Sequence, residues 1–152
     1  MSIPNKITKE QKAYIAGLLD ADGSVGIDRS LSKSNAYKYN YRVRIIITNS
    51  NYDVICWLKD IVGVGCSHRT GRAYKANWSP VHRWQVVAES ARLVLKEIEP
   101  YMIIKKDLAK MAINFPSKGR VGKMRTTEDY REQERLYWKF KELNQRGYQC
   151  TI

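Results

Sequence analysis

Two carboxylates stand beside a glycine near the start of the chain, in the run Asp20-Ala21-Asp22-Gly23. Carboxylate oxygens are ligands that Mg²⁺ prefers, and a divalent ion held by them can activate a water molecule for attack. The ion also stabilises the charge that develops on a leaving oxygen, which is what hydrolysis of a phosphodiester requires. The acidic turn is therefore the first candidate for chemistry in this sequence.

The net charge of the chain points to a polyanionic partner for that chemistry. The 152 residues include 27 Lys and Arg against 15 Asp and Glu, which gives a net charge of +12 and a pI near 9.7. Nucleic acid is the first candidate partner and an acidic membrane surface the second, while a merely soluble basic protein is the plain alternative. The basic residues form no amphipathic basic helix, which disfavours the membrane surface.

Length and residue usage limit the architecture and the location. A chain of this size predicts one domain, with a core over about 8–115, a basic linker over 116–126 and a C-terminal helix over 127–146. No stretch approaches the roughly 20 apolar residues that cross a bilayer, and no apolar signal segment begins the chain. We expect an intracellular protein, in a prokaryotic cytoplasm or an organelle. The three cysteines and two histidines are too scattered for a zinc site.

Helical and strand periodicities alternate along the chain and must position the acidic turn. Thr8 and Gln11 form a capping-box pattern, and we expect the helix that follows to end at Gly23 in the left-handed conformation. The order of elements predicts an α+β fold with helices on one face of a curved antiparallel sheet. The predicted strands are 24–29, 37–48, 66–70, 73–79 and 81–88, and the later helices are 51–62, 89–98, 105–114 and 128–145.

Small residues recur three or four positions apart on the first helix, at Ala13, Ala16, Gly17 and Ala21. Such a stripe lets a second backbone approach closely. It is equally compatible with small residues that fit under a crowded sheet.

Strand 37–48 alternates in a way that separates an apolar face from a basic one. Tyr39, Tyr41, Val43, Ile45 and Ile47 share one face, and arginines lie on the other. Donor-rich side chains on the strands and the basic linker suit contacts with phosphates and base edges. The candidate DNA-binding residues are Arg29, Lys38, Asn40, Arg42, Arg44, His68, Arg69, Arg72, Lys75, Asn77, His82, Arg83, Gln85, Lys118, Arg120 and Lys123.

The run Ile15-Ala-Gly-Leu-Leu-Asp-Ala-Asp-Gly-Ser24 closely resembles the signature of the LAGLIDADG homing endonucleases. The resemblance continues in the turn Gly63-Val-Gly65 and in Pro100-Tyr-Met-Ile-Ile-Lys-Lys106, so it spans about 8–115. It is closest to the short, single-motif branch. It implies a site-specific DNA endonuclease of an intron or intein-like element.

The resemblance also implies roles for individual residues. Asp22 is expected to bind Mg²⁺, with Mn²⁺ or Ca²⁺ as alternatives, and the carbonyl of Ala21 to help. Asn49 would order the attacking water, and Lys105 would polarise water or stabilise the transition state. Asp20 is expected to serve the helix end and the interface. Because one chain has one acidic turn and duplex DNA has two strands, a homodimer is implied, with Ala13, Ala16, Gly17 and Asp20 at its interface.

One departure from the family pattern concerns the residues after Asn49. Close relatives carry a basic residue there, whereas the stretch 50–53 has an acid and no base. Either the solvent network differs from that of relatives, or its positive charge comes from elsewhere, with Arg69 or a loop lysine as candidates. An intron maturase or a non-catalytic DNA- or RNA-binding protein on the same fold is the alternative function, although an intact Asp22 and Lys105 argue against binding alone.

Overall fold

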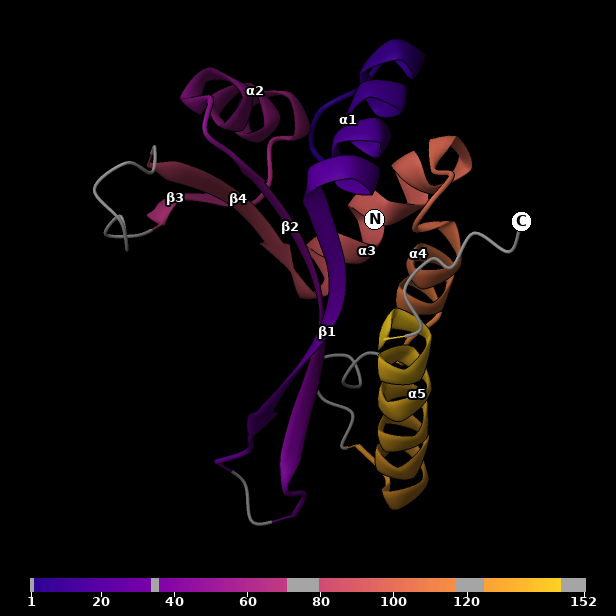
Figure 1. The fold of residues 1–152 in the computed structure, drawn as a ribbon. Helices are drawn as coiled ribbons and strands as arrows, with labels where there is room; N and C mark the ends of the chain where they lie inside the picture. Colours follow the sequence, from indigo (N-terminus) through magenta and orange to yellow (C-terminus); the bar gives the residue numbers. More distant parts are fainter. Residues whose placement is uncertain (1, 34–35, 71–79, 117–124, 146–152) are drawn as a thin grey trace.

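A computed structural model describes residues 2–33, 36–70, 80–116 and 125–145. In this part of the chain, helices lie on one side of a four-stranded antiparallel sheet with strand order β1-β2-β4-β3 (Figure 1). The predicted α+β architecture is confirmed. The strands are β1 (Gly23–Leu31), β2 (Tyr39–Asn49), β3 (Cys66–Thr70) and β4 (Val81–Val87), and the helices are α1 (Lys9–Asp22), α2 (Tyr52–Val62), α3 (Ala88–Ile98), the 3-10 turn η1 (Glu99–Tyr101), α4 (Lys106–Ile113) and α5 (Thr127–Gln145).

Helix α1 begins with the predicted capping box and passes directly into β1. The Thr8 hydroxyl accepts a hydrogen bond from the Gln11 backbone N–H, and the Gln11 side chain accepts one from the Thr8 N–H. The expected left-handed glycine at the end is wrong, because Gly23 is extended, with φ −104° and ψ 178°. Glycine is needed for space instead: a Cβ there would lie 2.6 Å from Leu19 Cδ1 and 2.9 Å from the Ile46 carbonyl oxygen.

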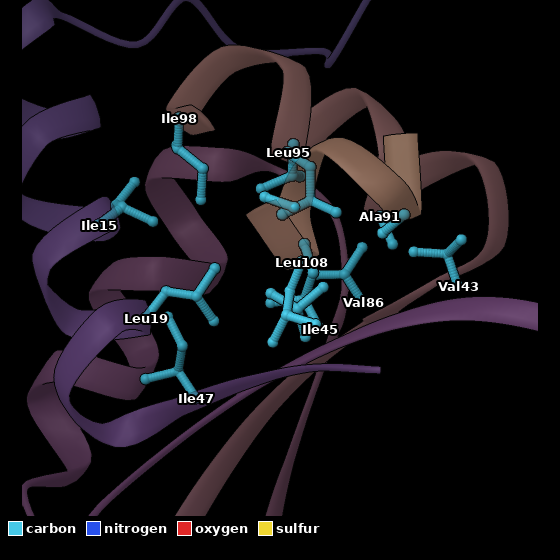
Figure 2. Packing of buried hydrophobic residues seen from close by; sticks show 14 of the residues in the cluster. Ile15, Leu19, Val43, Ile45, Ile47, Val86, Ala91, Leu95, Ile98 and Leu108 are labelled. Carbon is cyan, nitrogen blue, oxygen red and sulfur yellow. The ribbon is translucent and has the colours of Figure 1, made fainter. Parts of the chain in front are cut away.

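The covered face of the sheet carries the core, as the alternation in β2 predicts. Val43, Ile45 and Ile47 are at most 2% exposed. Figure 2 shows Ile15 and Leu19 of α1 converging on this face beside side chains of α3 and α4. Each fully buried aliphatic side chain contributes about 1.5 to 3 kcal/mol. The core therefore fixes α1, and with it the acidic turn, on the sheet.

Helix α2 ends in the predicted glycine turn. Gly63 caps it with φ +73°, and Gly65 has φ +96°, both in the region that disfavours other residues. Gly65 also lies tight against β4, because a Cβ would stand 2.7 Å from the indole nitrogen of Trp84. That nitrogen donates a hydrogen bond of 3.1 Å to the Val64 carbonyl, which joins the turn to the core.

Helix α5 packs against the covered side of the β1–β2 hairpin through aromatic contacts (Figure 1). Its buried residues are Gln133, Tyr137 and Phe140. The ring of Tyr137 lies 5.3 Å from that of Tyr41 in β2. Trp138 on the same helix is 56% exposed.

The boundaries of the described helices and strands agree with the sequence to within a few residues. The predicted strand 73–79 lies outside the described residues. None of the helices in the described ranges is long and apolar enough to cross a membrane.

The glycine turn generates a stability prediction. Gly65→Ala introduces both an unfavourable φ and a clash with Trp84, so we expect the free energy of unfolding to fall by about 2 to 4 kcal/mol. Gly26→Ala is the matched control, since the nearest atom to its added Cβ is 3.5 Å away at the Arg44 side chain. Urea unfolding followed by tryptophan fluorescence measures both, and equal stabilities for the two variants would contradict the packing argument.

Candidate active site and nucleic-acid interface

The C-terminal end of α1 is held by a buried carboxylate from its own last turn. Asp20 is 9% exposed and accepts backbone N–H bonds from Ile103 at 2.7 Å, Ile104 at 3.1 Å and Lys105 at 2.9 Å. Burial acts to raise the pKa of Asp20, but these three N–H donors and the charge of Lys105 outweigh it, and the pKa is lowered. Asp20 thus fastens α1 to the segment before α4.

Lys105 joins the same two segments, but as a hydrogen-bond donor to the end of α1. Its ammonium donates to the carbonyls of Leu19 at 2.8 Å, Asp20 at 2.7 Å and Gly23 at 2.7 Å. A cation at a helix C-terminus satisfies carbonyls that have no partner within the helix. Burial lowers the pKa of Lys105, and the carboxylates of Asp20 and Asp22 oppose that effect. All three donors of the ammonium are occupied by the turn that carries Asp22.

Asp22 presents its carboxylate outward from this braced turn. It is exposed, and its side chain has no hydrogen bond or ion pair with another described residue. The carbonyl of Ala21 is not among those that Lys105 binds. Within the described ranges no three His, Cys, Asp or Glu side chains cluster as a metal site. At this turn the described residues thus offer one exposed carboxylate beside a helix-end carbonyl.

Asn49 lies at the same end of the sheet as Asp22. Gly23 pairs with Ile47, so Asn49 stands two residues, about 7 Å, further along β2. Its side-chain oxygen accepts the Asn51 N–H at 2.8 Å. Asp22, Lys105 and Asn49 are thereby gathered at one end of the β1–β2 pair.

The sheet register places two predicted contact residues in a row with Asn49. Asn49 pairs with His82, and His82 pairs with Arg69, which puts Arg69 two strands, about 10 Å, from Asn49. A shallow cavity of about 250 Å³ is lined by Tyr52, Ser67, His68, Arg69 and His82. The row lies on the face that carries Ile47 and Trp84, at the end of the sheet. Arg69 and His82 are therefore not on the uncovered face.

The face of the sheet away from the helices, called here the open face, carries most of the described basic candidates. Directly paired residues of antiparallel strands point to the same side, so the register assigns each residue to a face. The candidates on the open face are Asn40, Arg42, Arg44, His68, Arg83 and Gln85. Lys38 is exposed just before β2, with its ammonium 5.3 Å from the ring centroid of Tyr39.

Arg29, also predicted as a contact residue, does not lie on the open face. It pairs with the buried Tyr41 and therefore faces the helices. Its guanidinium lies 4.4 Å from the Tyr39 ring centroid and 5.1 Å from those of Tyr137 and Trp138. Cation–π stacking makes Arg29 a brace between β1 and α5.

The predicted small-residue stripe is divided between two faces of α1. Ala16 is fully buried in the chain's own core, so it is not available on the surface. Ala13, Gly17 and Ala21 are exposed, and a Cβ built on Gly17 meets no atom within 4 Å. The exposed small residues of α1 are thus four positions apart.

Sequence reasoning missed one residue of the open face, Asp28. Its carboxylate lies 3.0 Å from Arg44 Nη1 and 3.6 Å from Arg42 Nε. Alternation within β1 was the available signal, but the pairing of Asp28 with Arg42 depends on register. The candidates Arg72, Lys75, Asn77, Lys118, Arg120 and Lys123 lie outside the described residues.

Comparisons with known proteins agree on one family. The family model described as LAGLIDADG endonuclease matches residues 15–113. A search of curated proteins found no match.

Among solved structures, three similar ones illustrate the fold. The homing endonuclease I-CvuI, in complex with the I-CreI target in the presence of Mg with the DNA not cleaved, is 23% identical, covers 95% of this chain and 87% of its own, and has a TM-score of 0.72. The archaeal intron-encoded homing endonuclease I-Vdi141I complexed with DNA is 18% identical, with 94% and 89% covered and a TM-score of 0.73. The meganuclease I-SmaMI bound to uncleavable DNA is 19% identical, with 84% of this chain but 43% of its own covered and a TM-score of 0.65.

The junction of α1 with residues 103–105 generates a pH prediction. Asp20→Asn removes the anion that three N–H groups and Lys105 stabilise, so we expect the free energy of unfolding at neutral pH to fall by about 2 to 4 kcal/mol. Because the folded-state pKa of Asp20 is lowered, its contribution is complete above the ordinary Asp pKa of about 3.9 and is lost as pH falls through the lower folded value.

Denaturant unfolding of wild type and variant between pH 7 and pH 2 measures this difference. Asp60→Asn, at an exposed position of α2, is the matched control. A stability gap for Asp20→Asn that stays constant to pH 2 would show that the charge of Asp20 is not what stabilises the junction.

Proposed function

The chain belongs to the LAGLIDADG endonuclease family, and we propose that its working form is a homodimer that cuts both strands of a long, nearly palindromic DNA site with Mg²⁺. Its activity is that of a metal-dependent, site-specific DNA endonuclease. The finer points of the proposal are the dimer, the ion and the residues that act. We also propose an intracellular site of action, in a cytoplasm or an organelle, where such DNA is found.

The observation that carries the proposal is the outward carboxylate of Asp22 on a rigid turn at one end of a basic open face. The turn is fixed on one side by the core under α1 and on the other by Lys105. Positioned groups on rigid elements accelerate a reaction because their geometry requires no reorganisation. DNA that lies along the open face would bring a phosphodiester to this end of the sheet.

The residues present suit a divalent ion, with Asp22 and the Ala21 carbonyl as its ligands from this chain. Hard oxygen donors of this kind suit Mg²⁺, which usually keeps several waters and binds one or two carboxylates together with phosphate oxygens. When bound, the ion supplies an activated water and charge stabilisation on the leaving oxygen. Asn49, with an amide that reaches the same end of the sheet, would orient water.

Lys105 contributes mainly by placing the acidic turn. Its ammonium already donates to three carbonyls, so contact with water or phosphate requires it to exchange one of them. Arg69 is the described cation in the same row as Asn49, and it fits the positive charge that the stretch 50–53 lacks.

A homodimer is supported by the surface around α1. Ala13 and Gly17 form a stripe of small residues on which a second helix can pack closely. Apolar side chains flank it, including Ile103, which is 86% exposed, and Tyr14, which is 52% exposed. Asp20 supports this surface from inside, because it binds the backbone of Ile103.

The size and charge of a dimer fit a long DNA site. This chain matches 43% of I-SmaMI, so two copies approach the length of that single chain. The eleven residues of β2 span about 36 Å, close to one turn of duplex DNA. Two chains carry +24, twice the +12 of one, so affinity should fall steeply with salt.

The metal assignment predicts the effect of Asp22→Asn. Loss of the ion's charge stabilisation costs several kcal/mol, so we expect cleavage to fall by about a thousandfold or more, while DNA binding is retained. Cut sites are first selected from a randomised duplex library with Mg²⁺, and one such site is then used with both proteins. Asp60→Asn is the control for loss of a carboxylate elsewhere, and undiminished cutting by Asp22→Asn would refute the assignment.

The dimer predicts a separate outcome for Gly17→Leu. The added side chain meets open space within one chain, so folding should be unaffected, but it would hold a partner helix away. Analytical ultracentrifugation should show that the variant is a monomer. A cleavage assay should show that it has lost double-strand cutting. Lys139→Leu, which places the same side chain on exposed α5, should remain dimeric, and a dimeric Gly17→Leu would rule out packing on this stripe.

A further inference from the structure

Asp28 is an acid in the middle of a basic surface. The other described open-face residues of β1, Ser24, Gly26 and Ser30, are uncharged, and among the described strand residues of that face Asp28 is the single acid. The Asp28 side chain is 25% exposed, and its carboxylate pairs with two arginines of β2. An acid so placed repels DNA phosphates, so it weakens general affinity. A compensating role in recognition would account for its position.

The geometry around Asp28 shows what it does to Arg44. Gly26 is the residue opposite Arg44, and a Cβ on Gly26 would lie 3.5 Å from Arg44 Nη2 and 3.8 Å from Nε. The guanidinium therefore lies across β1 over the glycine and reaches Asp28, where Nη1 and Oδ1 are 3.0 Å apart. The Nε atom is buried in this position and has no hydrogen-bond partner among the described residues. The guanidinium thus packs on the backbone of β1, and the carboxylate fixes its orientation.

The second arginine is held less closely. Arg42 lies directly opposite Asp28, but its Nε is 3.6 Å from the carboxylate and its side chain is 55% exposed, against 35% for Arg44. Long side chains lose rotamer freedom when they bind, and an arginine already fixed by a carboxylate has lost part of it beforehand. Arg44 is thus the arginine of this pair that is preorganised.

We propose that Arg44 reads a guanine edge in the major groove and that Asp28 is the positioning residue that orients its guanidinium. The proposal rests on the proposed function, since it requires duplex DNA on the open face. Arginine makes the commonest specific contact with guanine, through two N–H groups to O6 and N7. With one N–H of Nη1 directed to Asp28 and Nε buried, the second N–H of Nη1 and those of Nη2 are the donors left for O6 and N7. Asp28 thus lowers the affinity for DNA of any sequence and raises the preference for one base.

The test is selection of bound sites from a randomised duplex library with EDTA, so that binding is measured without cutting. Wild type should prefer a G·C pair at one position of each half-site, by roughly 5- to 150-fold over other pairs. Both Arg44→Lys, which lacks the planar fork, and Asp28→Asn should reduce that preference about fivefold or more and leave the other positions unchanged. Asp28→Asn should also bind random-sequence DNA more tightly than wild type.

Asp60→Asn makes the same chemical change on α2, away from the open face, and should leave every base preference as in wild type. The proposal is overturned if Asp28→Asn strengthens binding and keeps all base preferences, because Asp28 would then act only as a charge. It is equally overturned if Arg44→Lys keeps the G·C preference. Selection of no sequence by wild type would refute the proposed function as well, whereas normal site-specific cutting by Asp28→Asn with unchanged preferences would refute this inference alone.

Discussion

The structure depends on an exchange of hydrogen bonds between the last turn of α1 and the segment before α4. Asp20 accepts three backbone N–H groups of that segment, and Lys105 donates to three backbone carbonyls around the α1–β1 junction. Each charge is compensated by backbone groups of opposite polarity at a partly buried position. The backbone that carries Asp22 is consequently held from both sides, although Asp22 itself takes no part.

This arrangement gives the two acids of the motif different surroundings. The motif contains two acids of the same type two positions apart, and their surroundings give them different roles. Asp20 is buried and bonded, whereas Asp22 is exposed and available to an external ligand. Exposed Ala13 and Gly17 on the same helix leave the surface around the turn accessible to a second chain.

Much of this fold follows from local patterns that a sequence displays directly. The capping box at Thr8, the alternation of β2 and the glycine turn at Gly63 depend on neighbours in sequence, and all were predicted. Residues whose environment is set by distant segments were harder to predict. The left-handed conformation expected for Gly23 is wrong because the chain passes there directly into β1, and Arg29 faces the helices because the strand register pairs it with Tyr41.

Some residues of the candidate site were predicted from the sequence and others were not. Asp22, Lys105 and Asn49 were identified by resemblance, and the structure brings them to one end of the sheet. That Ala16 is buried, and that Asp28 pairs with Arg44, could not be read from one chain. Helix rotation and strand register are fixed by the packed core, and a shift of one residue in register would exchange the faces of a strand.

The brace between Arg29 and α5 has a mechanical consequence for the hairpin that it supports. Helix α5 lies beyond residue 113, where the match to the family model ends, yet it stiffens the end of β1 and β2 that is far from the acidic turn. The two ends of the same pair of strands therefore have different supports: the hydrogen bonds of Asp20 and Lys105 at the end with the acidic turn and α5 at the other. Changes in α5 should therefore act on the far end of the hairpin and leave the hydrogen bonds that hold the acidic turn in place.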